Sequence, residues 1–561
     1  MKKIIFFFLI FLFYPRQIIV AATDNYVTVV NPVRARNLWQ SVDSVKNQIN
    51  LILDYKIPST WLLQYDVIID DEAWELFKKL PNDQELGVFL EVSERLATDG
   101  YVPYLLGMGD WARPDKVLLS GYLPDERKRI IDKLFEKFKS RFGLYPVSVG
   151  AWYIDTLSLD YLAEKYNIQT VLDVADQYST DKYGIWGKPW GLPYIPSRLN
   201  SLLPAKNEQE KMTVVKIQWA QRDPVRGFGS TVADSNFSMQ ANDYINNKLD
   251  TNYFKKLTGV YLGLASPIKQ LTVGLEAGQE GAVFYEEFKK QLQYLKQLQG
   301  KNEIVILTMK LFAKEYNNRF PLLNPGVFIS GTDYFDPSIE AYWYSSRFYR
   351  IGLIKQNNKL FIRDFRIYPD YLPNRDIFTN DLSVELKRVI PGTIDEVLKR
   401  NSKMLFSDVT NIKIINKNDK IDIYSEDKKG NEHLISLLED KVVVEGKAIF
   451  EKDKQSGFKD DLDRFLSRTI VDYWVKYPHE WFGSWRFSKI NNKFYFGFMI
   501  SPDYLTGIKS EFPLLGSFQF PFQTLIRFKS FPKLGIAEFI SDYLVKSINN
   551  STIKISEKHL L

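Results

Sequence analysis

The stretch Gly150-Ala151-Trp152-Tyr153-Ile154-Asp155, followed by Thr156-Leu157-Ser158-Leu159-Asp160-Tyr161-Leu162-Ala163-Glu164-Lys165-Tyr166, decides the fold. An apolar run ends in a carboxylate, a helix begins at once, and a second apolar run, Thr170-Val171-Leu172, follows. This order predicts a β-strand that carries an acid to the start of a β/α unit. In parallel β/α folds, the carboxyl ends of the strands are where ligands bind and reactions take place.

The same layout recurs along the N-terminal half of the chain. Short apolar runs predict strands, and apolar residues at helical spacing predict the helices between them. The predicted strands span residues 26–30, 60–65, 86–90, 147–151, 170–172, 214–217, 271–275 and 303–307, and the predicted helices span about 41–55, 71–79, 125–140, 156–166 and 281–299. Continuous apolar strands joined by helices indicate a parallel sheet covered by helices. We therefore expect an α/β fold, a seven-stranded (β/α) barrel.

Chain length and local sequence pattern divide the chain into three parts. Residues 1–22 have the pattern of a signal peptide: Lys2 and Lys3 precede an apolar run, and Val20-Ala21-Ala22 offers small residues for cleavage. The apolar run is shorter than the ~20 residues that span a bilayer. We therefore expect an exported protein of the extracellular space, periplasm or cell envelope, with the membrane involved only if this segment stays as an uncleaved anchor.

The remaining part of the 561-residue chain is too long to form a single compact domain. We predict the barrel over residues 23–325. Beyond residue 325 the strand-like runs are separated by turn signals, which predicts a β-rich accessory region with some helices, of one or two units, over 326–561.

Composition excludes several classes of function. The net charge is +6, three of these charges lie in the N-terminal segment, and no basic cluster is interleaved with aromatics, so we expect no nucleic-acid partner. Cysteine is absent, which excludes disulfides and thiolate chemistry. The three histidines lie at positions 433, 479 and 559, outside the predicted barrel. A His-rich zinc site or a Ser-His-Asp triad therefore cannot form from barrel residues, and we expect neither a metal nor a cofactor.

Carboxylates remain as the acid, base and nucleophile. Asp155 and Glu276 each end a predicted strand, and Glu276 is followed by Ala277-Gly278, which allows close approach. We hypothesise that Asp155 is the nucleophile or base and Glu276 the general acid of a glycosidase. The two carboxyls would then lie about 5–5.5 Å apart in a retaining enzyme or about 6.5–9.5 Å apart in an inverting one. Asp155 is equally well placed to cap the helix that follows it.

Further residues are candidates for substrate binding. Glu91 and Asp66 follow apolar strands as Asp155 does, and Arg34 follows the first strand, although a structural ion pair would explain the arginine as well. The chain is rich in aromatics, at 15%, and flat aromatic faces suit sugar rings but also fill large cores. Residues 174–212 form a loop of a length that is usually functional. The predicted substrate-binding residues are Glu91, Asp66, Arg34, Trp152, Trp186, Trp190 and Asp181.

Three segments resemble known families. Gly150 to Asp155, with the helix and the strand that follow, resembles the nucleophile segment of family 57 glycoside hydrolases. Leu271 to Glu276 is similar in layout to the later segment of that family, which supplies the acid, and Ile57 to Leu63 is similar to the second strand of polysaccharide deacetylases. The resemblance covers about residues 25–320 and implies a divergent member of the glycoside hydrolase/polysaccharide deacetylase-like superfamily, with a seven-stranded β/α barrel.

The chain departs from both families at their motifs. Asp155 stands where family 57 has Glu, and Asn31-Pro32 and Glu91-Val92-Ser93-Glu94 stand where deacetylases carry their metal-binding motifs. Three hypotheses follow: an exported hydrolase that cleaves glycosidic bonds with paired carboxylates, a catalytically inactive barrel that binds polysaccharide in the cell envelope, and a polysaccharide deacetylase with an atypical metal site. Each implies a polysaccharide or oligosaccharide partner, and the oligomeric state is left open.

Overall fold

The computed structural model describes residues 24–452 apart from 105–112, 229–236, 264–266, 369–375, 377–379, 391, 398–401 and 418. Beyond residue 452 it describes four backbone strands, β23 (Tyr473–Lys476), β24 (Gly483–Ile490), β25 (Lys493–Ile500) and β26 (Thr524–Phe528), in one antiparallel sheet. The predicted signal peptide lies outside the described residues. Among the helices that are described, none has the length and hydropathy needed to cross a bilayer.

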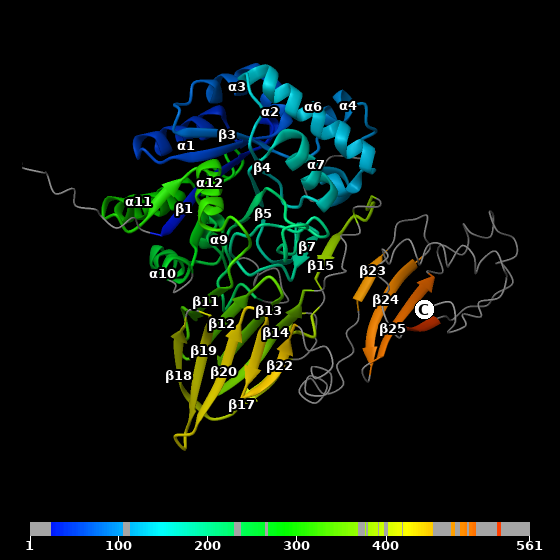
Figure 1. Ribbon diagram of the computed structural model, residues 1–561. Coiled ribbons are helices and arrows are strands. Elements are labelled where there is room, and N and C mark those ends of the chain that lie inside the picture. The colour runs from blue at the N-terminus through cyan, green and yellow to red at the C-terminus, as the bar shows by residue number, and fades with distance from the viewer. Residues whose placement is uncertain are drawn as a thin grey trace, which may run out of the picture.

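Eight parallel strands form the first sheet (Figure 1). They are β1 (Asn25–Val33), β2 (Ser59–Leu63), β3 (Gln84–Phe89), β4 (Ser148–Gly150), β5 (Thr170–Val174), β8 (Val215–Trp219), β9 (Lys269–Val273) and β10 (Val305–Leu307). The sequence predicted all eight, because their side chains are buried almost without interruption and the strands therefore appear as continuous apolar runs.

Seven of these strands form a barrel, in which β1 joins the two ends of the sheet. The ladder runs β1-β2-β3-β4-β5-β8, and β9 pairs with the other edge of β1, while β10 pairs with its first residues only. Between β8 and β9 the gap is bridged by Gln221, which donates to Gln270 and accepts from the Thr272 amide at 2.9 Å. The predicted seven-stranded (β/α) barrel is therefore confirmed as a nearly closed barrel.

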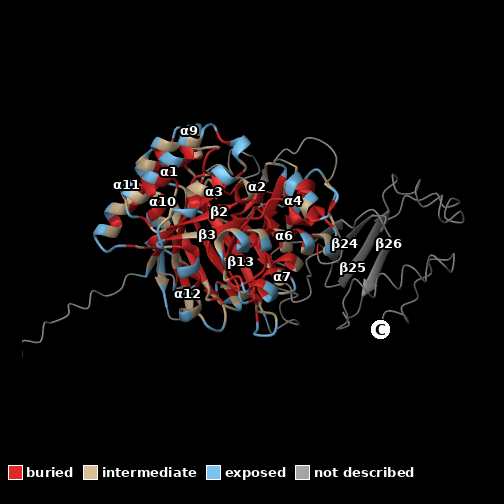
Figure 2. Cartoon of the chain, turned by 90° about the horizontal axis from the view of Figure 1, so that it is seen from above, coloured by how far each residue is buried: buried red, intermediate tan, exposed pale blue. Residues whose placement is uncertain are grey.

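Helices surround these strands, and buried residues occupy the strands and the inward helix faces (Figure 2). The helices are α1 (Val42–Asp54), α2 (Tyr65–Ile69), α3 (Asp71–Lys78), α4 (Glu94–Asp99), α5 (Pro114–Val117), α6 (Pro124–Phe142), α7 (Thr156–Tyr166), α9 (Ala241–Asn246), α10 (Thr251–Leu262), α11 (Tyr285–Gly300) and α12 (Met309–Arg319), with short 3-10 turns at Arg36–Leu38 and Leu119–Gly121. Most begin with a polar cap. The side chains of Ser41, Asp155 and Asp250, for example, each accept a hydrogen bond from the backbone N–H three residues later.

The long segment after β5 is a hairpin followed by a coiled stretch. β6 (Gln177–Thr180) and β7 (Tyr183–Trp186) are joined by Asp181 and Lys182. A third strand, β15 (Leu386–Val389), arrives from far along the chain and pairs in parallel with β7. The small sheet β15-β7-β6 therefore joins the two halves of the sequence beside the barrel.

Beyond residue 325 the chain is β-rich, as predicted. One antiparallel sheet contains β11 (Val327–Thr332), β12 (Glu340–Ser345), β13 (Tyr349–Gln356), β14 (Lys359–Ile367), β16 (Ile394–Asp395) and β17 (Lys403–Phe406). The other contains β18 (Val409–Asn416), β19 (Lys420–Asp427), β20 (Glu432–Leu438), β21 (Lys441–Val444) and β22 (Lys447–Glu451). Apolar side chains of both sheets share a second core, in which Tyr349, Phe365 and Phe450 are in ring contact.

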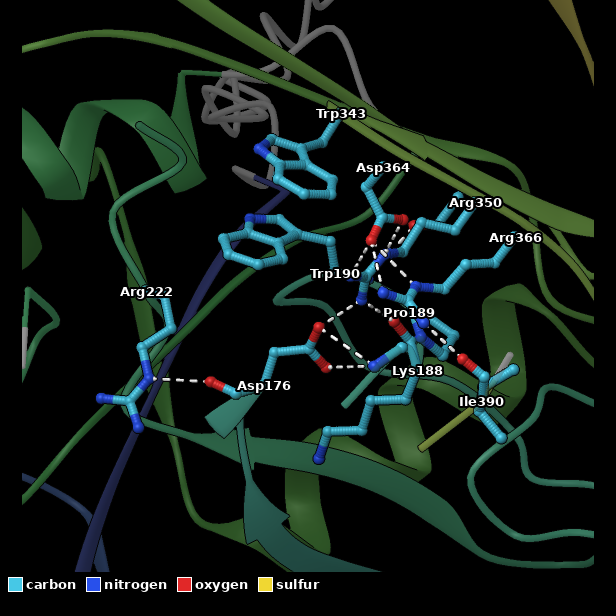
Figure 3. Close-up of polar contacts among 12 residues, drawn as sticks. Asp176, Lys188, Pro189, Trp190, Arg222, Trp343, Arg350, Asp364, Arg366 and Ile390 are labelled. Carbon is cyan, nitrogen blue, oxygen red and sulfur yellow. Dashed lines mark hydrogen bonds and ion pairs between the residues drawn. The ribbon is translucent and has the colours of Figure 1, made fainter. Parts of the chain in front are cut away.

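Buried charges and rings join the barrel to the first antiparallel sheet (Figure 3). Arg350 of β13 pairs with Asp364 at 3.0 Å and also contacts Asp176, which follows β5. Trp190 stacks on Trp343 of β12 with ring centroids 4.2 Å apart and planes 7° apart. Ring stacking and fully paired charges at a buried boundary make this junction a rigid part of the molecule.

Candidate functional site

Arg34 is the centre of a cluster at the carboxyl edge of the barrel. It directly follows β1, and its side chain is buried. Its Nε and Nη2 donate to the two oxygens of Glu91, which follows β3, at 2.7 Å each. Its Nη1 pairs with Glu276, which follows β9. The barrel thus brings Glu91 and Glu276, which are 57 and 242 positions from Arg34 in the sequence, into direct contact with this arginine.

Amide groups complete the coordination of this arginine. Gln279 accepts from Nη1 of Arg34 at 2.9 Å. Gln64, at the end of β2, contacts Glu91 at 3.5 Å and accepts from the Ala35 amide at 2.8 Å. The guanidinium therefore donates to acceptors that follow β3 and β9, and Gln64, after β2, contacts Glu91 in turn, which fixes the position of the arginine.

Aromatic rings flank the same guanidinium. Its central carbon lies 5.5 Å from the ring centroid of Phe89 and 5.6 Å from that of Trp152, within the range of cation–π attraction. Trp152, which follows β4, also contacts Phe89 at 5.1 Å and Trp219 at 5.8 Å. The predicted site residue Trp152 therefore lies beside Arg34, Glu91 and Glu276.

Two glutamates at this edge hold protons near neutral pH. Burial raises the pKa of Glu276 to about 7, because desolvation, with Glu91 and Asp181 nearby, outweighs the attraction of Arg34. Burial and the neighbouring Glu276 raise the pKa of Glu280 to about 8. Asn242 donates to Glu280 at 3.0 Å. Since the Glu276 side chain keeps 15% of its surface exposed, a protonated carboxyl is accessible at this edge.

Asp181, in the β6–β7 turn, interacts electrostatically with the same cluster. Burial raises its pKa to about 6, with Arg34 opposing the shift, and it in turn acts on the pKa of Glu276. Tyr183 donates to Asp181 at 3.4 Å. Both turn residues have positive φ, 54° for Asp181 and 62° for Lys182, which only a few L-residues adopt. Two-residue hairpin turns take positive φ at both central residues, so this geometry is that of an ordinary tight turn.

Asp155 occupies a different environment. It is fully buried, caps α7 by accepting from the Ser158 amide at 3.0 Å and the Ser158 hydroxyl at 2.6 Å, and pairs with Arg127 at 3.0 Å. None of these contacts leads to Glu276. The helix-cap interpretation of this residue thus matches its geometry, and its role as nucleophile or base stays a prediction.

The other predicted site residues lie apart from Arg34. Asp66 is in the first turn of α2, half-buried, with burial raising its pKa. Trp186 and Trp190 are buried in the junction with the first antiparallel sheet, packed on Phe228 and Trp343. A role of these rings in stacking on a substrate stays a prediction, and this burial does not support it. Of the predicted residues, the structure gathers Arg34, Glu91, Glu276, Trp152 and Asp181.

Sequence reasoning missed four residues that surround this cluster: Gln64, Tyr183, Gln279 and Glu280. Gln64 directly follows β2 as Arg34 directly follows β1, so its position at the end of a strand could have marked it as a site residue. Glu280 stands four residues after Glu276, within reach of it in a turn. Tyr183 had no such signal, because its place depends on how the hairpin folds back over the barrel.

The cluster does not suit a metal ion. Within residues 24–452 as described, no group of three or more His, Cys, Asp and Glu side chains is arranged to hold one. The carboxylates that converge here, Glu91 and Glu276, have Arg34 between them as counter-ion. A guanidinium at the centre repels a divalent cation, so these residues do not fit a metal-dependent site.

Comparison with known proteins places the fold. No family model matches the chain, and no curated protein matches it in sequence. Among solved structures, a candidate glycoside hydrolase/deacetylase from Parabacteroides distasonis superposes with a TM-score of 0.51 at 13% identity, over 67% of this chain and 92% of that one. Candidate polysaccharide deacetylases from Mycobacterium smegmatis (TM-score 0.33, 11% identity, 53% and 92% covered) and Pseudomonas aeruginosa PAO1 (0.32, 13%, 54% and 93%) are also similar. The first of these matches shows that the chain shares the barrel fold of that structure.

Proposed function

We propose that this protein is an exported carbohydrate-active hydrolase that cleaves glycosidic bonds, with Glu276 as its general acid. Fold alone does not define activity, so the proposal depends on the site. The observation that carries it is the position of Glu276: a carboxyl that holds its proton to about pH 7, partly exposed at the barrel edge, among other carboxyls. Two carboxyls with different proton affinities are the chemistry that glycoside hydrolysis needs.

The chemistry assigns a role to each neighbour of Glu276. A protonated Glu276 can donate to the oxygen that leaves when a glycosidic bond breaks. Arg34 holds Glu276 in place and lowers its pKa, but burial and the charge of Glu91 outweigh this effect and keep the pKa of Glu276 raised. Trp152 is buried between Phe89, Trp219 and Arg34, so it supports the cluster, and its contact with a sugar ring stays a prediction. A polysaccharide or oligosaccharide is therefore the substrate class that we propose.

A second function, binding of polysaccharide without cleavage, is favoured by one observation. Both oxygens of Glu91 are taken by the buried Arg34, so one of the carboxylates at this edge is committed to an ion pair rather than to a reaction. If no other carboxyl completes the catalytic pair, the edge can still hold a sugar.

A panel of glycans, tested for both binding and release of reducing ends, separates these functions. We expect hydrolysis by the wild type and a loss of kcat on the order of 10²–10⁴ in Glu276→Gln, with the melting temperature held or raised because a buried acid is replaced by its neutral isostere. Gln293→Glu, a surface change on α11, serves as the control and should keep full activity. Release by Glu276→Gln at the wild-type rate would refute the proposal, and binding without release would favour the binding function.

The pH profile gives an independent check. Because the acid must be protonated, kcat should fall as the pH rises above about 7, the pKa of Glu276. A profile that stays flat from pH 6 to pH 9 would contradict the assignment.

A further inference from the structure

Arg222 lies at the carboxyl edge of the barrel, close behind the end of β8. It follows that strand by three residues, just as Glu276 follows β9 by three residues. Gln221, the residue before it, bridges β8 to β9 through its side-chain amide. Tyr261 of α10 donates to the Arg222 carbonyl at 2.5 Å. The fold therefore fixes Arg222 at the edge that carries the candidate site.

Arg222 is a buried cation without a counter-ion. It keeps 5% of its surface exposed, yet no carboxylate of the described residues pairs with it. The other buried arginines in this part of the chain each pair with an Asp or Glu carboxylate. They are Arg34, Arg127, Arg350, Arg363, Arg366 and Arg388. Because a buried charge without a partner is strongly unfavourable, the exception at Arg222 points to a ligand as the missing partner.

The acceptors that Arg222 has are neutral, and its bonds to them are long. Its Nε donates to the carbonyl of Asp176 at 3.2 Å, and its Nη2 donates to the side-chain oxygen of Gln177 at 3.3 Å. The carboxylate of Asp176 pairs with Arg350 instead (Figure 3). Since a guanidinium has five N–H donors, these two bonds leave Nη1 and one N–H of Nη2 without an acceptor among the described residues. Two adjacent nitrogens of this kind bind a carboxylate through parallel hydrogen bonds.

Asp243 interacts with Arg222 electrostatically but does not form an ion pair with it. The Ser238 hydroxyl donates to the Asp243 carboxylate, and burial raises the pKa of Asp243 to about 7, so a large part of it is protonated near neutral pH. Desolvation lowers the pKa of Arg222, which is the shift of a buried cation that no close anion compensates. The charge of Arg222 is therefore left for a ligand.

We infer that Arg222 binds the carboxylate of an acidic sugar, so that the glycans taken at this edge contain uronic acid residues. The inference rests on the proposed function, because it names the substrate class of the same edge. A planar carboxylate fits the free side of the guanidinium, and its single negative charge matches the single positive charge of Arg222. A doubly charged phosphate ester fits less well, since Glu91 and Glu276 lie at the same edge.

Titration calorimetry with the full chain tests this inference. The probes are oligosaccharides of galacturonate and of glucuronate, each compared with its methyl ester, which has the same sugar units but no charge. The wild type should bind the acids on the order of 10–100-fold more tightly than the esters, through charge-assisted hydrogen bonds. Arg222→Gln should lose this preference, and Arg222→Lys should keep part of it, because lysine retains the charge without the fork. Arg226→Gln is the matched control and should keep the full preference, since Arg226 is already paired with Asp333 at 2.5 Å.

Stability separates a binding role of Arg222 from a structural one. Arg222→Gln should melt at or above the wild-type temperature, because it removes a buried charge that has no counter-ion. Where Arg222→Gln does not fold, Arg222→Lys decides: a full preference for the acids in this variant would overturn the inference.

The remaining outcomes distinguish this inference from the proposed function. Equal affinity of the wild type for acids and esters, no binding of either, or a preference that survives in Arg222→Gln would overturn the inference. Tighter binding of sulfated than of carboxylated oligosaccharides would overturn the choice of carboxylate. Cleavage of neutral glycans without any preference for acids would leave the proposed function standing alone. A preference that requires Arg222, in a protein that cleaves no glycan, would overturn the hydrolysis and leave the carboxylate site.

Discussion

Replacing Arg34 by methionine tests the candidate site without a substrate. Methionine keeps much of the side-chain volume but removes the charge, which leaves Glu91 and Glu276 buried without their counter-ion. Removing one partner of a buried ion pair costs about 3–5 kcal/mol, because the remaining charge stays desolvated. At roughly 2 cal/mol/K per residue over a unit of about 430 residues, this cost lowers the melting temperature by about 3–6 °C.

The effect of Arg34→Met should depend on pH in a defined direction. Without the guanidinium, the folded state holds protons on Glu276 more tightly than the unfolded state does, so stability relative to the wild type is lost as the pH rises. Melting curves at pH 5 and pH 8 should therefore show the larger loss at pH 8. The double variant Arg34→Met/Glu91→Gln should recover part of it, since one of the two uncompensated carboxyls is removed.

Arg36 provides a matched control for this experiment. It lies two residues further along the chain, keeps 40% of its side chain exposed and pairs with Asp70 and Glu72 at the surface. Exposed ion pairs contribute about 0–1 kcal/mol, so Arg36→Met should change the melting temperature by about 1 °C or less. The reasoning is refuted if Arg34→Met melts like Arg36→Met at pH 8, or if its loss is the same at pH 5 and pH 8.

Three further predictions concern packing and buried charge. Burial raises the pKa of Asp243 to about 7 from an ordinary value near 4, so the wild type loses folding stability as the pH rises through this range. The stability of Asp243→Asn relative to the wild type should therefore increase by about 3 kcal/mol between pH 5 and pH 8, as measured by thermal melts. Gly274→Ala should destabilise by about 1–3 kcal/mol or more, because its methyl group would lie 1.8 Å from a carbonyl oxygen of β1, whereas Gly259→Ala, with nothing within 4 Å, should not destabilise. Trp190→Ala should cost about 3–5 kcal/mol and alter the near-ultraviolet circular dichroism, since it removes the ring stacked on Trp343.

The barrel could be predicted from sequence because its strands are buried on both faces. Each appears as an apolar run, and several of these runs, such as those of β1 and β2, are followed by a polar residue at the edge of the barrel. Arg34, Glu91 and Glu276 could be predicted for the same reason, as residues directly after strands. Their mutual contacts could not be predicted, because these depend on which strands are neighbours in the barrel. Since β9 pairs with β1, Glu276 meets Arg34 although 242 positions separate them in the sequence.

Asp155 shows why a local pattern can have two meanings. An acid between a strand and a helix is suited both to catalysis at the barrel edge and to capping of the helix, and the sequence is the same in both cases. The difference lies in Arg127, whose side chain pairs with Asp155 and draws it into the interior. Likewise, Trp190 lies in a long loop that suggested substrate contact, but its packing partner Trp343 is about 150 residues away.

Near residue 325 the secondary structure changes from β/α units to antiparallel sheets, and some residues beyond this point still pack in the apolar cluster of the barrel. Val327, Ile329 and Trp343 from the β-rich part pack in the same apolar cluster as the barrel strands, and so do Leu386 and Ile390. A separate accessory module would instead meet the barrel through a smaller and more polar surface. The C-terminal half also contributes β15, which pairs with β7 in the sheet beside the barrel, so segments on both sides of residue 325 form one packed unit.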